Sequence, residues 1–199
     1  MTAPSRPQVT WSIWAGWTLA STFGFPTGIF ASSIILQAKW SIRGIVVWAG
    51  STFDNAISGA VVSLVLGVVQ RLVVREWLRY ARLWIVMSVA GWALGMALAS
   101  GIVDRSIIGV ALGLVVGTSQ WLVLRRQVNQ AGWWILATTV AWIASFIITT
   151  LQADQQALFV LITFSGAVAG IITGVAMGWL LRHPMQQPDQ SAPSSVSSA

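Results

Sequence analysis

The chain has 199 residues, of which 56% are hydrophobic and only 8% are charged, and its formal net charge is +6. An ordinary soluble domain carries about 25% charged residues, so this composition excludes a soluble fold, whose surface would lack polar side chains. The absence of cysteine excludes disulfides and cysteine-based metal sites. The basic residues lie beside apolar segments, where they anchor helices at a membrane surface, so we expect no nucleic acid partner.

Five long stretches without a charged residue indicate helices that cross a lipid bilayer. About 20 mainly apolar residues span a bilayer as a helix, which satisfies its own backbone hydrogen bonds inside lipid. A membrane β-barrel would instead alternate apolar and polar residues, and these stretches are apolar on all sides. The uncharged stretches cover residues 9–38, 83–103, 106–124, 127–153 and 155–181.

In chain order, we expect six spans that pair into three helical hairpins, because segments that contain two spans recur along the chain. The hairpins are predicted at about 11–75, 83–125 and 133–182. Their first helices are predicted at 11–36, 83–103 and 133–151, and their second helices at 55–74, 106–124 and 157–181.

Two segments of the chain are predicted to lie outside the spans. Residues 37–53, with basic residues and tryptophans, link the two helices of the first hairpin. We expect an interfacial helix there, and the alternative is one long tilted helix that runs into the second span. The transmembrane domain thus covers residues 1–183, whereas 184–199, rich in Ser, Pro and Gln, form a disordered polar tail.

Residues 54–92 repeat at residues 104–142, which is a shift of fifty positions. The register persists across two helices and the loop between them, so chance matching of apolar residues does not explain it. Partial copies flank this pair: the dipeptide at 16–17 matches that at 91–92, and the glycines of 166–182 match those of 109–125. The matched pairs include Asp54 with Asp104, Gly67 with Gly117, Gln70 with Gln120, Arg75 with Arg125, Trp84 with Trp134 and Trp92 with Trp142.

Basic residues are distributed unequally between the two sides of the predicted bundle. Eight arginines lie on the side that holds the N-terminus, whereas Lys39, Arg43 and Arg105 lie on the other. Because positive residues favour the cytoplasmic side, we expect both termini in the cytoplasm. Each repeat has two spans, so all copies point the same way. The predicted fold class is therefore all-α, a polytopic transmembrane helix bundle of six spans in three parallel helical-hairpin repeats.

Small residues recur at every fourth position of each second helix, as in Gly109, Gly113 and Gly117. Residues four apart share a helix face, and small residues let membrane helices approach closely. We expect these ladders to pack the six helices against one another, with a homo-oligomer seam or a narrow conduit as the alternative. The other ladders are Gly59, Ser63, Gly67 and Gly166, Gly170, Gly174, Gly178.

Gln70 and Gln120 continue two of these ladders, three positions past Gly67 and Gly117, where the third hairpin has Met177. An unsatisfied amide in hydrocarbon is costly, so each glutamine needs a partner. We expect a hydrogen bond to a neighbouring helix, because both positions lie away from the bilayer midplane where transport sites usually sit. A polar substrate or a lipid headgroup is the alternative partner.

Charged residues mark both ends of the second helices. Arginines end them, as expected for cations that stabilise a helix C-terminus and reach the membrane surface. A shared basic surface for anionic lipid headgroups is the sharper interpretation of the same arginines. At the opposite ends we expect aspartates to be N-caps, which accept the free N–H groups of the first turn. The arginines are Arg75, Arg125, Arg126 and Arg182, and the aspartates are Asp54, Asp104 and Asp154.

Six of the thirteen tryptophans lie at the predicted cytoplasmic boundary, where we expect an aromatic belt. No histidine lies inside a predicted span to ligate a haem iron, so we expect no cofactor and no metal. The six are Trp77, Trp84, Trp121, Trp133, Trp134 and Trp179.

The segment 117–126, Gly-Thr-Ser-Gln-Trp-Leu-Val-Leu-Arg-Arg, and the segment 131–135, Ala-Gly-Trp-Trp-Ile, resemble a family of uncharacterised multi-pass membrane proteins. The family occurs in cyanobacteria, Chloroflexi and related bacteria, and its repeated Gly-rich helix ends in Gln-Trp-Leu-Val-Leu-Arg-Arg. The resemblance covers roughly residues 9–183 and is weakest in the first hairpin, where Gln70-Arg71 replaces Gln-Trp. It implies a location in a bacterial plasma membrane and supplies no catalytic residues.

The predicted spans contain no charge near their middle and no nucleophile with a neighbouring base. We therefore expect a non-enzymatic structural or accessory membrane component, with a small transporter or channel for an unidentified solute as the alternative. An enzyme acting on lipids would need a base from a loop, such as Glu76 or His183. The expected partners are bilayer lipids, including anionic lipids on the cytoplasmic side, and either a second copy of the chain or another membrane protein.

Overall fold

The computed structural model describes residues 11–37, 51–102, 104–149 and 155–185, and the regular secondary structure of these residues is entirely helical. This confirms the predicted all-α fold class. The helices are α1 (Trp11–Gln37), α2 (Thr52–Val74), α3 (Ala81–Leu98), the short 3-10 helix η1 (Ala99–Gly101), α4 (Arg105–Leu124), α5 (Trp133–Ile148) and α6 (Gln155–Leu181).

Five of these helices are long and apolar enough to cross a membrane, namely α1, α2, α3 with η1, α4 and α6. Helix α5 has 16 residues, which is about 24 Å at 1.5 Å per residue, against about 30 Å of hydrocarbon core. The residues that would extend this span, 150–154, lie outside the described part of the chain. The architecture is compatible with an integral membrane protein.

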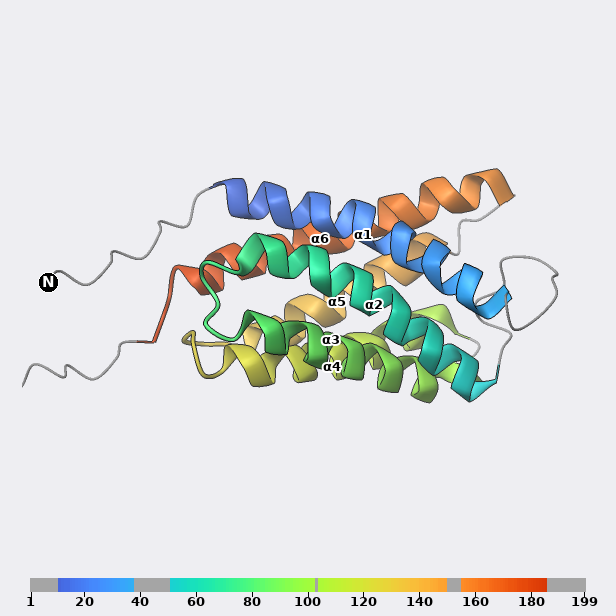
Figure 1. The fold of residues 1–199 in the computed structure, drawn as a ribbon, viewed down its shortest axis with the longest axis horizontal. Coiled ribbons are helices and arrows are strands. Elements are labelled where there is room, and N and C mark those ends of the chain that lie inside the picture. Colours follow the sequence, from blue (N-terminus) through green and yellow to red (C-terminus); the bar gives the residue numbers. More distant parts are fainter. Residues whose placement is uncertain (1–10, 38–50, 103, 150–154, 186–199) are drawn as a thin grey trace, which may run out of the picture.

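The six α-helices form a closed ring around a central axis. Each helix packs against the next one along the chain, and α6 packs against α1. Figure 1 shows the helices running along the long axis of the molecule, with the start of α1 and the end of α6 at the same end. The loops from α2 to α3 and from α4 to α5 also lie there. We call this end the arginine end, after Arg75, Arg126 and Arg182.

The glycine ladders lie at contacts between helices of the ring. The α4 ladder faces α5, where a Cβ atom built on Gly113 would lie 2.5 Å from Thr139 Cα. The α6 ladder faces α1 in the same way, and a Cβ atom on Gly170 would lie 3.0 Å from Thr18 Cα. Because a larger side chain would displace backbone at these positions, the prediction that the ladders pack helices within the chain is confirmed for them, whereas a Cβ atom on Gly178 would have no neighbour within 4 Å.

The N-cap prediction for Asp104 is confirmed by the start of α4. Asp104 is the N-cap of α4, as predicted, and its carboxylate accepts a hydrogen bond from the Ser106 N–H at 2.8 Å. The Ser106 hydroxyl donates to the same carboxylate, and these hydrogen bonds, the hydroxyl first, lower the pKa of Asp104 below its ordinary value of 3.8. The prediction for Asp154 falls outside the described residues.

The N-cap prediction for Asp54 is wrong, because Ser51 holds the N-cap position of α2. The Asp54 N–H donates to Ser51 Oγ at 3.2 Å, and the Ser51 hydroxyl donates to the Asp54 carboxylate at 2.9 Å. This two-way arrangement is related to the capping box, in which the third helical residue supports the cap. Helix α2 therefore begins at Thr52, earlier than the predicted start at residue 55.

The ends of two other predicted segments also differ from the structure. Ser51 has an extended backbone (φ −60°, ψ 162°), so α2 is not the continuation of a longer helix, and that alternative for the linker is wrong. The interfacial-helix prediction falls on residues 38–50, outside the described part. The first helix of the second hairpin, predicted at 83–103, is α3, which gives way to η1 and leaves Ile102 extended.

Candidate functional site

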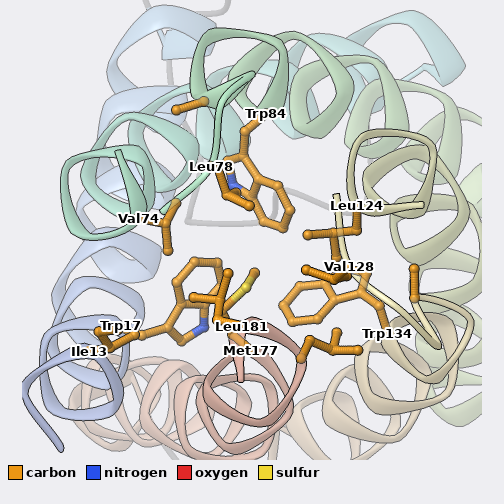
Figure 2. Close-up of a cluster of buried hydrophobic side chains, with 13 residues drawn as sticks. Ile13, Trp17, Val74, Leu78, Trp84, Leu124, Val128, Trp134, Met177 and Leu181 are labelled. Atoms are coloured by element: carbon orange, nitrogen blue, oxygen red, sulfur yellow. The ribbon is translucent and has the colours of Figure 1, made fainter. Parts of the chain in front are cut away.

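Three tryptophans meet on the axis of the ring. Trp17 of α1, Trp84 of α3 and Trp134 of α5 are almost fully buried, and their ring centroids lie 5.5 to 5.8 Å apart. Their ring planes cross at 67° to 86°, the edge-to-face geometry that aromatic pairs prefer. Figure 2 shows the three indoles pointing toward one another, surrounded by apolar side chains. We call these residues the tryptophan triad.

Two indoles of the triad donate hydrogen bonds to the glutamines singled out in the sequence. Trp84 Nε1 donates to Gln70 Oε1 at 3.3 Å, and Trp134 Nε1 donates to Gln120 Oε1 at 2.9 Å. In both cases the bond joins the second helix of one hairpin to the first helix of the next. The two bonds lie fifty positions apart, so they are the same contact made twice.

The amide nitrogen of each glutamine bonds within its own hairpin. Gln70 Nε2 donates to Ser21 Oγ of α1 at 3.3 Å, and Gln120 Nε2 donates to Ser88 Oγ of α3 at 2.8 Å. Each glutamine therefore connects three helices, and the predicted interhelical hydrogen bond is confirmed. Both glutamine side chains are buried, with exposed fractions of 6% and 5%, so they lie inside the ring.

The contact between the third hairpin and the first is different, because the third hairpin has Met177 in place of a glutamine. Trp17 Nε1 donates to Thr173 Oγ1 of α6 at 2.9 Å. Thr173 lies four residues before Met177, and its hydroxyl donates in turn to Ala169 O at 2.6 Å. This contact joins α6 to α1, whereas α5 and α6 are joined farther along the axis, by hydrogen bonds between Ser145 and Ser165. No feature of the sequence alone singled out Thr173.

A second aromatic layer lies farther along the axis, toward the end opposite the arginine end. Phe25 of α1, Trp92 of α3 and Trp142 of α5 form it, and all three are buried. The centroid distances are 6.0 Å for Phe25–Trp92, 5.2 Å for Phe25–Trp142 and 4.7 Å for Trp92–Trp142. We call these residues the second aromatic layer. Each of them lies eight positions after a member of the triad, two turns along the same helix.

A cavity of about 20 Å³ lies between the tryptophan triad and the second aromatic layer. A cavity of roughly this size holds about one water molecule. The two aromatic layers flank this space, which does not fit a larger solute. Its polar lining comes from the side chains of Ser21, Gln70, Gln120, Thr138 and Thr173.

These layers correct one match inferred from the sequence, in which the dipeptide at 16–17 was paired with that at 91–92. A Cβ atom on Gly24 would meet Leu66 and Val69, and one on Gly91 would meet the residues fifty positions later, 116 and 119. The partner of Gly91 is thus Gly24. Trp17 corresponds to Trp84, and the shift between the first helices of these hairpins is 67 positions.

The aromatic-belt prediction is wrong for two of its six tryptophans. Trp84 and Trp134 lie at the expected level along their helices, but they face the axis and belong to the triad. Trp133, the neighbour of Trp134, is 58% exposed and faces outward. The signal that distinguishes them is a shared spacing on three first helices: tryptophan, then Ser or Thr four positions later, then an aromatic residue after four more. This pattern occurs at 17–25, 84–92 and 134–142.

Hydrogen bonds tie together the three segments of chain at the arginine end. Asn129 N–H donates to His183 O at 2.8 Å, and Met185 N–H donates to Gln127 O at 3.1 Å, which joins the α4–α5 loop to the residues after α6. Arg79 N–H donates to Gln127 Oε1 at 2.7 Å, which adds the α2–α3 loop. The predicted polar tail thus starts with two described residues, Pro184 and Met185, that pair with a loop. Residues 186–199 lie outside the described part.

These three segments line a cavity of about 590 Å³ that is partly open, which we call the arginine basin. The sequence singled out Arg75, Arg126 and Arg182, and the structure places all three in its lining, together with Arg79. Arg125 is not part of the described lining, and its guanidinium lies over the Trp121 ring, 5.0 Å from the centroid. Glu76 is the one carboxylate among the described lining residues.

Comparison of the chain with protein-family models, with curated proteins and with solved structures finds no match. Within the described ranges, no group of three or more histidine, aspartate or glutamate side chains is placed to hold a metal ion. The two candidate regions are therefore defined by geometry alone: a packed aromatic axis with a small cavity and the much larger arginine basin.

Proposed function

We propose that the protein is a non-enzymatic structural or accessory component of a bacterial plasma membrane. The observation that carries this proposal is the axis packed with aromatic side chains. The indole N–H groups of the tryptophan triad and the amides of Gln70 and Gln120 bond to neighbouring helices, and the cavity between the aromatic layers fits about one water molecule. A transporter needs an internal site that a solute enters, and this interior holds its polar groups for helix packing instead.

Recurring contacts support a description of the protein as three parallel hairpin copies. The bonds of Gln70 and Gln120 are the same contact at a shift of fifty positions, and the triad takes one tryptophan from each copy. With an even number of spans per copy, all copies have the same orientation. The excess of arginines at one end then favours both termini in the cytoplasm. The resemblance to multi-pass proteins of cyanobacteria and Chloroflexi is the basis for the bacterial location.

The test of this function is a flux assay on purified protein in liposomes, with a panel of ions, sugars and amino acids. We expect flux equal to that of protein-free liposomes for every solute. Specific flux that Gln120→Leu abolishes would replace the proposal with a transporter. Thr118→Leu is the matched control, because Thr118 lies on the same helix and faces outward. A lipid profile changed by deletion of the gene would instead point to a lipid-modifying enzyme.

The proposed topology has its own test, which uses the absence of cysteine in the natural chain. Single cysteines replace Asn129, in the α4–α5 loop, and Asp104, which begins α4 at the opposite end. A membrane-impermeant thiol reagent added to intact cells is expected to label the cysteine at 104 and to label that at 129 only after lysis. Labelling of both in intact cells would contradict the proposed arrangement.

A further inference from the structure

The arginine basin has an unbalanced charge. Four arginines and one glutamate line its described part, which leaves a formal surplus of three positive charges. The other carboxylates of the described chain, Asp54 and Asp104, begin helices at the opposite end of the ring and do not offset it. Guanidinium groups gathered around an open space attract anions, because the local potential sums over all of them.

The basin is also preorganised. Its walls come from three segments far apart in the sequence, and backbone or amide hydrogen bonds from Arg79, Asn129 and Met185 fasten these segments together. A ligand that enters the basin therefore does not have to order the loops, which lowers the cost of binding.

The donors suit a phosphate group. Each guanidinium offers a planar fork of N–H donors that matches phosphate oxygens, and these charge-assisted hydrogen bonds are stronger than neutral ones. The volume of about 590 Å³ exceeds that of a single phosphate and accommodates the atoms attached to it. Trp77 and Tyr80 supply aromatic surface to the same lining, where those atoms can pack. The basin thus combines forked cations with an apolar wall.

We propose that the arginine basin binds a phosphate-bearing group with two or more negative charges. Two sources present this chemistry, namely the headgroup of an anionic lipid and a soluble phosphate compound. The inference goes beyond the proposed function, since a structural component and a transporter can each hold such a ligand. Its outcome is therefore independent of the flux assay.

The test uses the full chain in detergent micelles and measures binding of phosphatidic acid, with phosphatidylcholine as the comparison lipid and pyrophosphate as the soluble probe. Arg126→Gln and Arg182→Gln each remove one basin guanidinium. Arg125→Gln removes the same charge from the adjacent residue, which stacks on Trp121 and is not part of the described lining. The melting temperature without ligand confirms that each variant is folded, and Arg75→Gln replaces any variant that is not.

We expect the wild type to prefer phosphatidic acid to phosphatidylcholine, and each basin variant to weaken this binding by about tenfold, because a charge-assisted hydrogen bond is lost. Arg125→Gln should weaken it by less than about twofold, as an exposed charge outside the site does. If pyrophosphate also binds, and the same variants weaken its binding, the basin takes a soluble phosphate compound. If pyrophosphate does not bind but phosphatidic acid does, the basin takes the headgroup of a lipid. Equal losses for Arg125→Gln and Arg126→Gln, or no preference for phosphatidic acid, would overturn the proposal.

Discussion

The axis of the ring and the arginine end belong to the same hairpins, yet they hold their polar groups in opposite ways. On the axis, the indole N–H groups of the tryptophan triad and the amides of Gln70 and Gln120 bond to neighbouring helices, and the cavity beside them fits about one water molecule. At the arginine end, four arginines line a cavity of about 590 Å³. A polar group inside the ring must be paired to avoid a desolvation cost, whereas an exposed cation stays hydrated until a ligand arrives. The first arrangement serves packing, and the second leaves groups free to bind.

The largest effect is expected where backbone meets backbone around the axis. Gly113→Leu places a side chain where even a Cβ atom would lie 2.5 Å from Thr139 Cα. We expect a loss of about 3 kcal/mol or more in unfolding free energy, because α4 and α5 must separate. Thermal unfolding in detergent measures it. Gly178→Leu is the control, since no atom lies within 4 Å of a Cβ built there, and equal losses in the two variants would contradict the packing account.

A smaller loss is expected when one hydrogen bond of the triad is removed. Trp134→Phe keeps an aromatic ring but deletes the N–H that bonds to Gln120 Oε1. We expect a loss of about 1–2 kcal/mol, because the amide oxygen is left unpaired inside the ring. The control is Trp133→Phe, at a residue that is 58% exposed and faces outward. A greater loss for Trp133→Phe than for Trp134→Phe would show that the axis does not hold the helices.

These two tryptophans show what the sequence does and does not predict. They are adjacent in the chain and lie at the same level along the helix. Because that level is the predicted cytoplasmic boundary of the membrane, the sequence placed both in an aromatic belt. Which face a residue presents depends on its angle around the helix, and apolar segments that are hydrophobic on all sides carry little of that information. The spacing shared with Trp17 and Trp84 does carry it, because only axis-facing residues meet their counterparts from the other hairpins.

Other features were predictable because their cause is local or because the membrane allows few solutions. The N-cap role of Asp104 follows from one turn of sequence, although Ser51 shows that a nearer hydroxyl can take the same role. The hydrogen bonds of Gln70 and Gln120 follow from the cost of a lone amide in hydrocarbon. The arginine basin was not predictable as a cavity, because its three segments come together only through the loop contacts of Gln127 and Asn129.

The third hairpin lacks the axial glutamine that the first two hairpins carry. Gln120→Met makes the second hairpin resemble the third, where Met177 stands at this position. We expect a loss of about 1–2 kcal/mol, similar to that of Trp134→Phe, since Trp134 and Ser88 both lose an interhelical partner. Thermal unfolding of this variant beside Thr118→Met, at an outward-facing position of α4, measures it. Unchanged stability would mean that the glutamine serves something other than packing.

The smallest effect is expected far from both regions, at the N-cap of α4. The hydrogen bonds from Ser106 lower the pKa of Asp104, so the folded state favours the ionised carboxylate. Its contribution to stability is complete above the ordinary value of 3.8 and is lost as the pH falls through the lowered pKa. Asp104→Ala should therefore lower the melting temperature slightly at neutral pH, and the difference should vanish in acid. A difference that persists at low pH would show that the charge of Asp104 is not its cause.

The central claim is that the axis stabilises the fold and that the arginine end binds a ligand. The most direct test is thermal unfolding of Trp134→Phe and Arg126→Gln, each with and without phosphatidic acid. We predict that Trp134→Phe lowers the melting temperature of the free protein and keeps the full stabilisation by the lipid. We predict that Arg126→Gln melts like the wild type and loses most of that stabilisation. Two variants that lose stability and lipid response together would contradict the account.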